Sequence, residues 1–223
     1  MSQSLLICAY RSLSVPTHDA TISVLAGSQY WTHHVKYGDA LIDRSRAVVT
    51  SAWYRLMQQD DVFLMVDDDM VFTSQDADRL VTLCRSGYDI ISAPVPTHNG
   101  GTIACRPSVN DFSGDHPLPM EYVGAAFMAV HRRVIDAVIQ TVPLCHPSLP
   151  IAFWPIFQPF WTELDGEMVY LSEDWAFVHR AREAGFKVWL EPTLRVGHKS
   201  EVVLTVDNMD AFHNIFGGRW GSG

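Results

Sequence analysis

The sequence predicts an α/β domain in which helices flank a central, mostly parallel β-sheet. Short runs rich in β-branched and aromatic residues alternate with amphipathic segments long enough to form helices. Most of the helical segments open on a capping residue or close on a glycine. The 223 residues are 48% hydrophobic, enough for one sizeable core. We therefore expect a single domain over residues 1–223, with residues 200–223 as a tail that forms a lid or is partly disordered.

The expected strands are six runs with an apolar or β-rich pattern. They cover residues 4–10, 31–36, 62–67, 88–93, 122–130 and 186–190. Two stretches between them resist assignment and read as long loops, namely residues 94–119 and 143–171. Loops of that length in a compact domain are usually functional or mobile.

Four helices are expected between these strands. The first covers residues 17–29, with Thr17 or Asp19 as its cap and Gly27 near its end. The second covers residues 38–59. Its shared face is expected to comprise Leu41, Ala47, Val48, Ala52 and Leu56.

The other two helices have clearer start and stop signals. Residues 73–87 open on a Ser or Thr cap, carry acids in the first turn and stop at Gly87. Residues 171–185 repeat this design, with Ser172 as cap, Glu173 and Asp174 in the first turn and Gly185 as the stop.

Charge and cysteine content narrow the range of functions. Sixteen Lys and Arg against 25 Asp and Glu give a formal charge of −9, which argues against a general nucleic-acid backbone binder but leaves room for a local basic groove. The four cysteines lie far apart without a C-x-x-C pair, so we expect reduced thiols rather than a zinc site or disulfides. The apolar start is too short for a signal peptide, and no run of 18 apolar residues follows, so we expect a soluble, cytoplasmic protein.

Three consecutive acids, Asp67, Asp68 and Asp69, follow the apolar run "VFLMV". They are expected at the carboxyl end of a central strand, where open α/β sheets bind ligands. Like charges this close are costly unless a cation neutralises them, and oxygen ligands suit Mg²⁺ or Mn²⁺. The alternative is a solvated acidic turn. The sequence contains neither a G-x-x-x-x-G-K-[ST] loop nor G-x-G-x-x-G after its first strand, so a metal held by acids is the remaining route to bind phosphates.

The segment "FLMVDDDMVF" resembles the D-x-D motif of GT-A glycosyltransferases of the family-2 type. Three further segments resemble the same family in the same order: "DALIDRSRAVVTSAW", "EYVGAAFMAVHRRVID" and "LSEDWAFVHRAREAGFKVWLEPTLRVGHKS". The resemblance implies the GT-A, or nucleotide-diphospho-sugar transferase, fold. It departs from the family pattern at Ala47, where an Asn often stands.

The resemblance also implies a metal and donor site. Asp67 and Asp69 would hold Mn²⁺ or Mg²⁺ with His198 as a third ligand, and Asp67 would also contact the donor. Asp68 points opposite to its neighbours in a strand, so it contributes to the donor site or bonds local backbone. A lone histidine such as His198 is more often structural.

Other residues are implied for the donor and acceptor. Arg44 and Arg46 lie on the helix near the donor, although residues two apart do not share a helical face and either can be an ordinary surface charge. Lys199 is an alternative phosphate partner, and Gly124 allows close approach of the sugar. Asp174, with Glu173 as substitute, is the expected catalytic base; both can instead be first-turn acids that favour the helix dipole.

The predicted function is metal-dependent transfer of a sugar from a UDP- or GDP-sugar to an acceptor hydroxyl, with inversion favoured. The acceptor is open between a glycan, a lipid-linked sugar, a small molecule, a protein and hydroxymethylated bases in DNA. A sugar nucleotidyltransferase and a non-catalytic sugar-nucleotide-binding module are the alternatives. The aromatic run "FWPIFQPFW", residues 153–161, is either core or a loop that stacks on a sugar ring or base.

Overall fold

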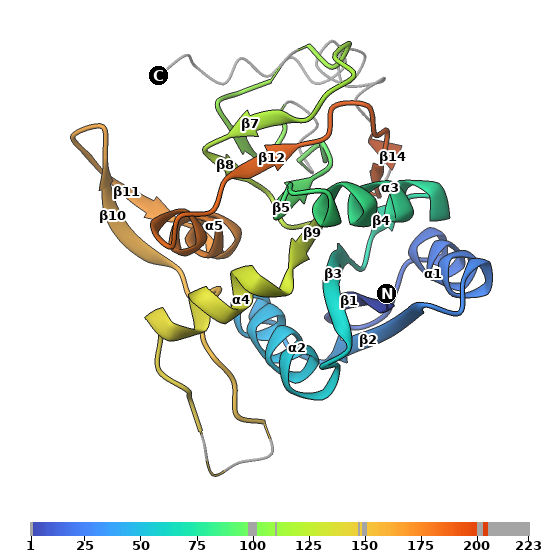
Figure 1. The fold of residues 1–223 in the computed structure, drawn as a ribbon, viewed down its shortest axis with the longest axis horizontal. Coiled ribbons are helices and arrows are strands. Elements are labelled where there is room, and N and C mark those ends of the chain that lie inside the picture. Colours follow the sequence, from blue (N-terminus) through green and yellow to red (C-terminus); the bar gives the residue numbers. More distant parts are fainter. Residues whose placement is uncertain are drawn as a thin grey trace.

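A seven-stranded mixed sheet forms the centre of the protein, in a computed structural model that describes residues 2–97, 102–109, 111–146, 148, 151–199 and 203–204 (Figure 1). The strand order is β2-β1-β3-β9-β5-β12-β7. Five of these strands run in one direction, while β9 and β7 run against them. The bounds are β1 Ser2–Ala9, β2 Trp31–Tyr37, β3 Asp60–Asp67, β5 Ile90–Ser92, β7 Leu118–Met120, β9 Phe127–His131 and β12 Val188–Leu190. The expected α/β fold with a mostly parallel sheet flanked by helices is confirmed.

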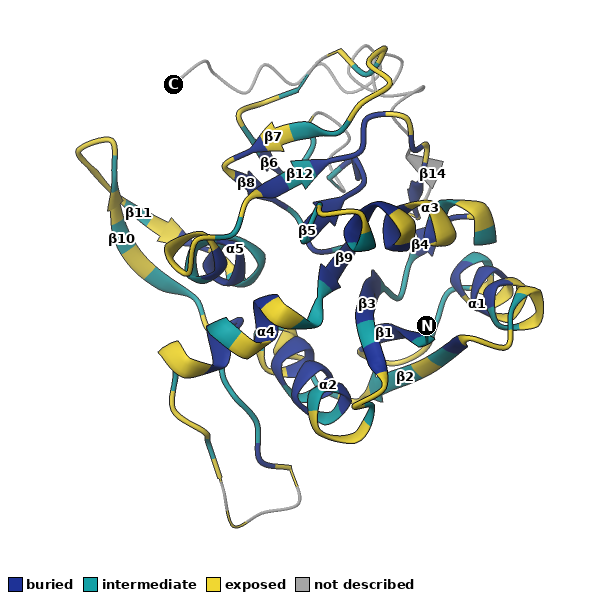
Figure 2. Cartoon of the chain, viewed as in Figure 1, coloured by how far each residue is buried: buried dark blue, intermediate teal, exposed yellow. Residues whose placement is uncertain are grey.

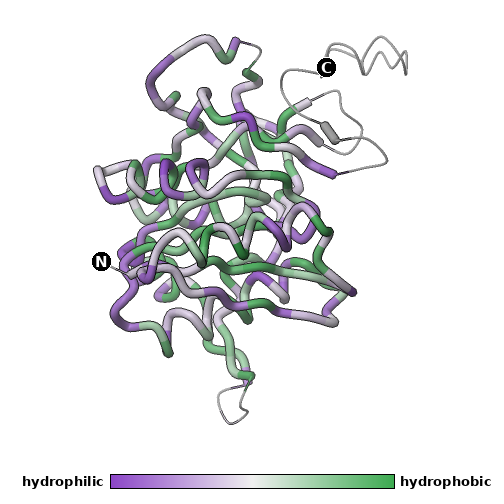
Figure 3. The backbone as a smooth tube through the Cα atoms, turned by 90° about the vertical axis from the view of Figure 1, so that its right-hand side faces the viewer, coloured by the Kyte–Doolittle hydropathy of each residue, from purple (hydrophilic) through white to green (hydrophobic). Residues whose placement is uncertain are grey.

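Helices cover both faces of the sheet. One face packs on α1 (Val15–Gly27) and α3 (Ser74–Arg85), and the other on α2 (Ile42–Leu56), α4 (Arg132–Val138) and α5 (Glu173–Glu183). A short 3-10 turn, Ile139–Thr141, follows α4. Leu5 and Ile7 of β1 face one core and Leu6 the other, as alternation along a strand requires. The strands through the middle are accordingly dark blue in Figure 2 and mainly green in Figure 3.

Three small sheets lie around the central one. They are β4 (Met70–Val71) with β13 (Gly197–Lys199) and β14 (Val203–Leu204), β6 (Cys105–Arg106) with β8 (Tyr122–Val123), and β10 (Phe160–Leu164) with β11 (Glu167–Leu171). The pairing of β4 with β13 places Met70 opposite His198. A segment near the end of the described chain therefore returns to the acidic triplet.

Several sequence predictions need correction at the level of elements. The run 122–130 forms two strands, because residues 124–126 are not in extended pairing. The first strand, β8, pairs with β6, and the second, β9, belongs to the central sheet. The unassigned run 143–171 contains the β10–β11 hairpin. The predicted tail lies outside the described residues except for the backbone of 203–204.

Helix α1 begins earlier than predicted. Its N-cap is Ser14, whose hydroxyl accepts from the Thr17 amide, and Pro16 lies in its first turn. The predicted Thr or Ser cap of α3 is confirmed as Thr73, which forms a capping box with Asp76.

The prediction of which residues form the buried face of α2 is wrong. Leu41 and Leu56 are exposed. The helix instead buries Ala47, Val49 and Trp53 together with a polar set comprising Ser45, Arg46, Thr50 and Ser51.

No helix in the described part of the chain is long and apolar enough to cross a membrane.

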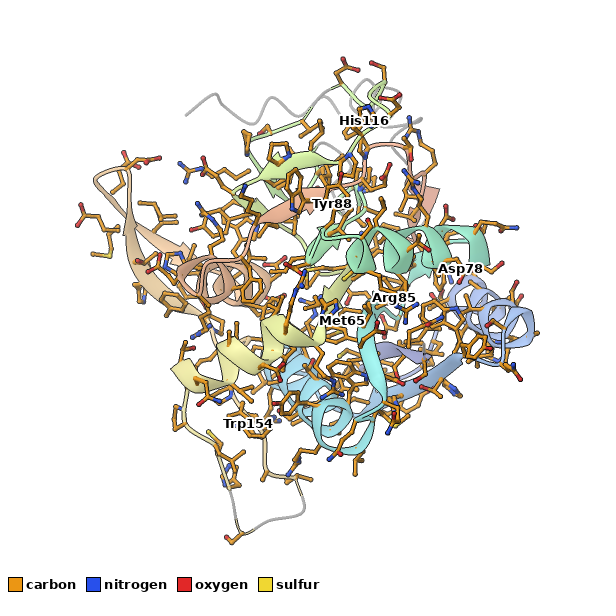
Figure 4. All side chains as sticks on the ribbon, viewed as in Figure 1. Met65, Asp78, Arg85, Tyr88, His116 and Trp154 are labelled. Carbon is orange, nitrogen blue, oxygen red and sulfur yellow. The ribbon has the colours of Figure 1, made fainter. Side chains whose placement is uncertain are left out.

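Arg85, at the last turn of α3, joins this helix to the start of the sheet (Figure 4). Its guanidinium donates to both carboxylate oxygens of Asp61, to the Ser2 carbonyl at 3.1 Å and to Gln3 Oε1 at 2.8 Å. Burial raises the pKa of Asp61, but the bonds from Arg85 outweigh it and the net shift is downward.

We expect Arg85→Met to lower the free energy of unfolding by about 2 kcal/mol, since bonds to charged groups contribute about 1.5–3 kcal/mol. A carboxyl with a depressed pKa stabilises above its ordinary pKa, so the difference from wild type should shrink as the pH falls below that value. Urea unfolding at pH 7 and below pH 4 measures both effects. The exposed Lys187→Met is the matched control, and equal losses in the two variants would contradict the assignment.

Candidate active site

Arg46 is the buried centre of the acidic cluster at the carboxyl end of β3. It is 3% exposed, although it carries a full charge. Its Nη2 donates to both oxygens of Asp67, at 2.8 and 3.0 Å, and its Nη1 donates to Glu173 Oε1 at 2.7 Å. Burial lowers the pKa of Arg46, but Asp67, Glu173 and Asp174 raise it above its ordinary value, so the guanidinium is cationic. Arg46 thus bridges the acidic triplet and the start of α5.

Glu173 and Asp174, predicted as alternatives for one role, occupy different environments. Glu173 accepts from Arg46, and burial raises the pKa of its carboxyl despite that contact. Asp174 Oδ1 accepts from the Ser172 hydroxyl at 2.5 Å and from the Trp175 amide at 2.8 Å. Ser172 lies at the predicted N-cap, yet its hydroxyl binds Asp174 rather than a backbone amide.

Gly124 leaves room beside the second oxygen of Asp174. A Cβ placed on Gly124 would lie 3.1 Å from Ala104 Cβ and 3.6 Å from Asp174 Oδ2. Both Gly124 and Asp174 line a cavity of about 240 Å³ together with Arg46, Asp67 and His198. A side chain at residue 124 would therefore press on Ala104 and contact the Asp174 carboxylate at the wall of this cavity.

Asp69 and His198 form the other polar pair of the site. Asp69 Oδ1 lies 3.1 Å from His198 Nε2, and His198 Nδ1 lies 2.8 Å from the Pro96 carbonyl oxygen. The carbonyl can only accept, so Nδ1 carries a proton and Nε2 faces the carboxylate. Burial lowers the pKa of His198, but the contacts with Asp69 and Pro96 outweigh it and raise the pKa overall.

This pair suits a divalent cation. An imidazole whose Nδ1–H is fixed by a backbone carbonyl offers Nε2 as a ligand, which is the usual arrangement of metal-binding histidines. Asp67, the third predicted ligand, is turned toward Arg46. Among the described residues, no three His, Cys, Asp or Glu side chains lie close enough together to hold a metal ion. Such a cation would take protein ligands from Asp69 and His198 and the rest from substrate or water.

Asp68 has a structural contact that the sequence suggested as one option. Its Oδ2 accepts from the Tyr10 amide at 3.3 Å, and its carbonyl accepts from the Ser14 amide at 2.7 Å. Burial and the adjacent Asp69 raise the pKa of Asp68. Asp68 therefore ties the β1–α1 loop to the end of β3.

A second cavity of about 210 Å³ adjoins the first. Its walls include Tyr10, Asp39 and the whole acidic triplet, and it shares Asp67 and His198 with the first cavity. The two cavities form a divided cleft, and we call the part where they meet, at Asp67 and His198, its waist.

Two predicted donor residues lie apart from these cavities. Arg44 is half exposed and donates to both oxygens of Asp39, at 2.7 and 2.8 Å, which lowers the pKa of Asp39. The Lys199 side chain is exposed and lines neither cavity, while its backbone amide donates to the Asp69 carbonyl.

Sequence reasoning missed Tyr10, Asp39, Pro96 and Ser172 as contributors to the site. The contact of Ser172 with Asp174 could have been predicted from sequence, because a hydroxyl two residues before a carboxylate at a helix start reaches it readily. The Pro96 carbonyl could not have been predicted, because a backbone oxygen is identified only by the fold.

The chain is thus an α/β protein with a carboxylate-rich cleft at the ends of its strands. No protein-family model and no curated protein matches its sequence. Among solved structures, it is similar to one titled "Crystal Structure of A197 from STIV", with a TM-score of 0.61 and 14% sequence identity over 93% of this chain and 91% of that chain. At this identity the similarity supports a shared fold and carries no statement about activity.

We expect Arg46→Met to lower the free energy of unfolding by about 3 kcal/mol, because it leaves the partly buried Asp67 and Glu173 without their cation. Arg44→Met, on the same helix, is the matched control and should cost less, because Arg44 is half exposed and Asp39 keeps a bond from the Leu41 amide. Denaturant unfolding of both variants measures the difference. Similar losses would show that Arg46 does not hold the cluster.

Proposed function

We propose that this chain is a metal-dependent glycosyltransferase of the GT-A fold, which moves a sugar from a nucleoside-diphosphate sugar to an acceptor hydroxyl with inversion. The observation that carries the proposal is the divided cleft: Asp174 lines one cavity, Asp69 lines the other, and His198, which contacts Asp69, lines both. A proton acceptor and a cation site on one continuous cleft are what displacement of a nucleoside diphosphate requires.

The donor would lie across the waist. The nucleoside end would occupy the cavity with Tyr10 and Asp39, and the sugar would enter the cavity beside Gly124. A Mn²⁺ or Mg²⁺ held by Asp69 and His198, with Asp67 adjacent, would neutralise charge on the departing diphosphate. Asp69, directly before β4, and His198, on β13, are held beside each other by the pairing of these two strands.

The chain's own groups supply the proton chemistry. Ser172 and the Trp175 amide hold Asp174 Oδ1, so Oδ2 is oriented to take the acceptor proton as the hydroxyl attacks the sugar. Arg46 positions Asp67 and Glu173 and offsets part of their negative charge. Glu173 is thereby a positioning residue, and Asp174 is the proposed base.

The first test is nucleotide binding. We expect UDP or GDP to bind in the presence of Mn²⁺, and Asp69→Asn and His198→Ala to weaken that binding at least tenfold because each removes a cation ligand. Isothermal titration with and without Mn²⁺ measures this. The exposed Asp115→Asn is the control. Absence of metal-dependent binding of either nucleotide would contradict the proposal and its nucleotidyltransferase alternative alike.

The second test separates the two neighbouring acids. We expect Asp174→Asn to reduce Mn²⁺-dependent hydrolysis of UDP- or GDP-sugars at least 100-fold while donor binding is kept, as loss of a general base does. Glu173→Gln should have the smaller effect on the rate, since its oxygen still accepts from Arg46. Steady-state hydrolysis and titration of the same preparations give both quantities. A Glu173→Gln variant slower than Asp174→Asn would reverse the assignment, and unchanged rates in both would exclude either acid as the base.

A further inference from the structure

The β10–β11 hairpin extends from the body of the protein beside α5 (Figure 1). Asp165 and Gly166, both with positive φ, form its tight turn. The register of the two strands places Trp161 opposite Tyr170 and Glu163 opposite Met168. Because side chains alternate along a strand, these four residues share one face of the hairpin.

The two faces of the hairpin differ in what they contact. On the inner face, Phe160 packs edge-on against His179 at 5.5 Å between ring centroids, and Leu164 and Val169 pack against the core. On the outer face, Trp161, Met168 and Tyr170 are 67%, 69% and 52% exposed (yellow in Figure 2). The Trp161 and Tyr170 rings lie 4.9 Å apart, so they form one exposed aromatic patch. We call Trp161, Glu163, Met168 and Tyr170 the aromatic face.

The charge of the hairpin narrows the classes of ligand that its aromatic face could bind. Residues 160–171 contain Glu163, Asp165 and Glu167 and no Lys, Arg or His. Arg106 pairs with Asp165, which leaves Glu163 exposed on the aromatic face and Glu167 exposed on the other side of the hairpin. Such a surface repels nucleic-acid phosphates and anionic lipids, and also a second copy of a chain whose formal charge is −9. Carboxylates accept hydrogen bonds from hydroxyls, and aromatic rings cover the apolar faces of sugars.

We propose that the aromatic face binds a neutral carbohydrate chain and is a remote subsite for the acceptor, an inference that rests on the proposed glycosyltransferase function. Tyr170 precedes Asp174 by only four residues, so their Cα atoms are at most about 14 Å apart. A glycan held on the hairpin would therefore place a hydroxyl a few sugar units away at the mouth of the cleft. Contacts with such remote, non-reacting units orient the reacting one.

The direct test is affinity electrophoresis of the full chain through gels that contain starch, a mixed-linkage β-glucan, xylan, mannan or galactan. We expect retardation by at least one of these neutral polysaccharides. Trp161→Ala and Tyr170→Ala should each weaken the affinity at least tenfold, and Trp161→Phe should keep most of it. Tyr30→Ala, which removes an equally exposed aromatic side chain elsewhere, is the matched control.

This readout uses neither donor nor metal, so its failure is distinct from failure of the proposed function. Absence of retardation in all five gels, or unchanged retardation of Trp161→Ala, overturns the proposal. Binding to glycan through Trp161 by a chain that binds neither UDP nor GDP with Mn²⁺ overturns the acceptor role and indicates a sugar-binding module. Concentration-dependent dimerisation that Trp161→Ala abolishes, measured by sedimentation, assigns the face to self-association instead. Unchanged Mn²⁺-dependent nucleotide binding by Trp161→Ala shows that the variant is folded.

Discussion

The buried ion cluster of Arg46, Asp67 and Glu173 is the interaction on which the architecture of the site depends. It joins the end of β3 to the start of α5 through one guanidinium from α2, and so holds Asp69, which follows β3, and Asp174, in α5, in one region. Without a cation between them, two partly buried carboxylates would repel and favour separation of α5 from the sheet. The cluster pairs Asp67 and Glu173 with Arg46, and the cavity-lining groups outside it include Asp174, Asp69 and His198.

The adjacent carboxylates Glu173 and Asp174 acquire different properties from their different burial and hydrogen bonds. Glu173 gives an oxygen to Arg46 and carries a raised pKa through burial, while Asp174 is held at one oxygen by a hydroxyl and an amide. The same division separates members of the acidic triplet. Asp68 secures the β1–α1 loop, while Asp67 and Asp69 turn to a guanidinium and an imidazole respectively. Local sequence places such acids together, and only their distant partners distinguish their roles.

The parts of the fold predicted from sequence are those fixed by local patterns. The Thr73 capping box, the glycine stop of α3 and the apolar strand before Asp67 each encode their structure within a few residues. The buried face of α2 could not be predicted. Arg46 is stably buried there because it pairs with carboxylates, and one of them, Glu173, lies far along the chain. The β10–β11 hairpin could have been predicted, because Asp165–Gly166 between alternating residues is a strong turn signal. The sequence analysis read this stretch as a loop instead. Of the site, the sequence placed Asp67, Asp69, His198 and the acidic pair in one region, and their individual contacts required the fold.

The pairing of β4 with β13 has a consequence for how the protein is made. The acids of the waist leave the ribosome early, but the strand that carries His198 emerges about 130 residues later. At typical synthesis rates that delay is on the order of 10 s. During it, Asp69 and its neighbours are present without the imidazole and without the α5 acids. A nascent chain therefore holds an acidic edge but no assembled cleft, and the site closes only when almost the whole described chain is available to fold.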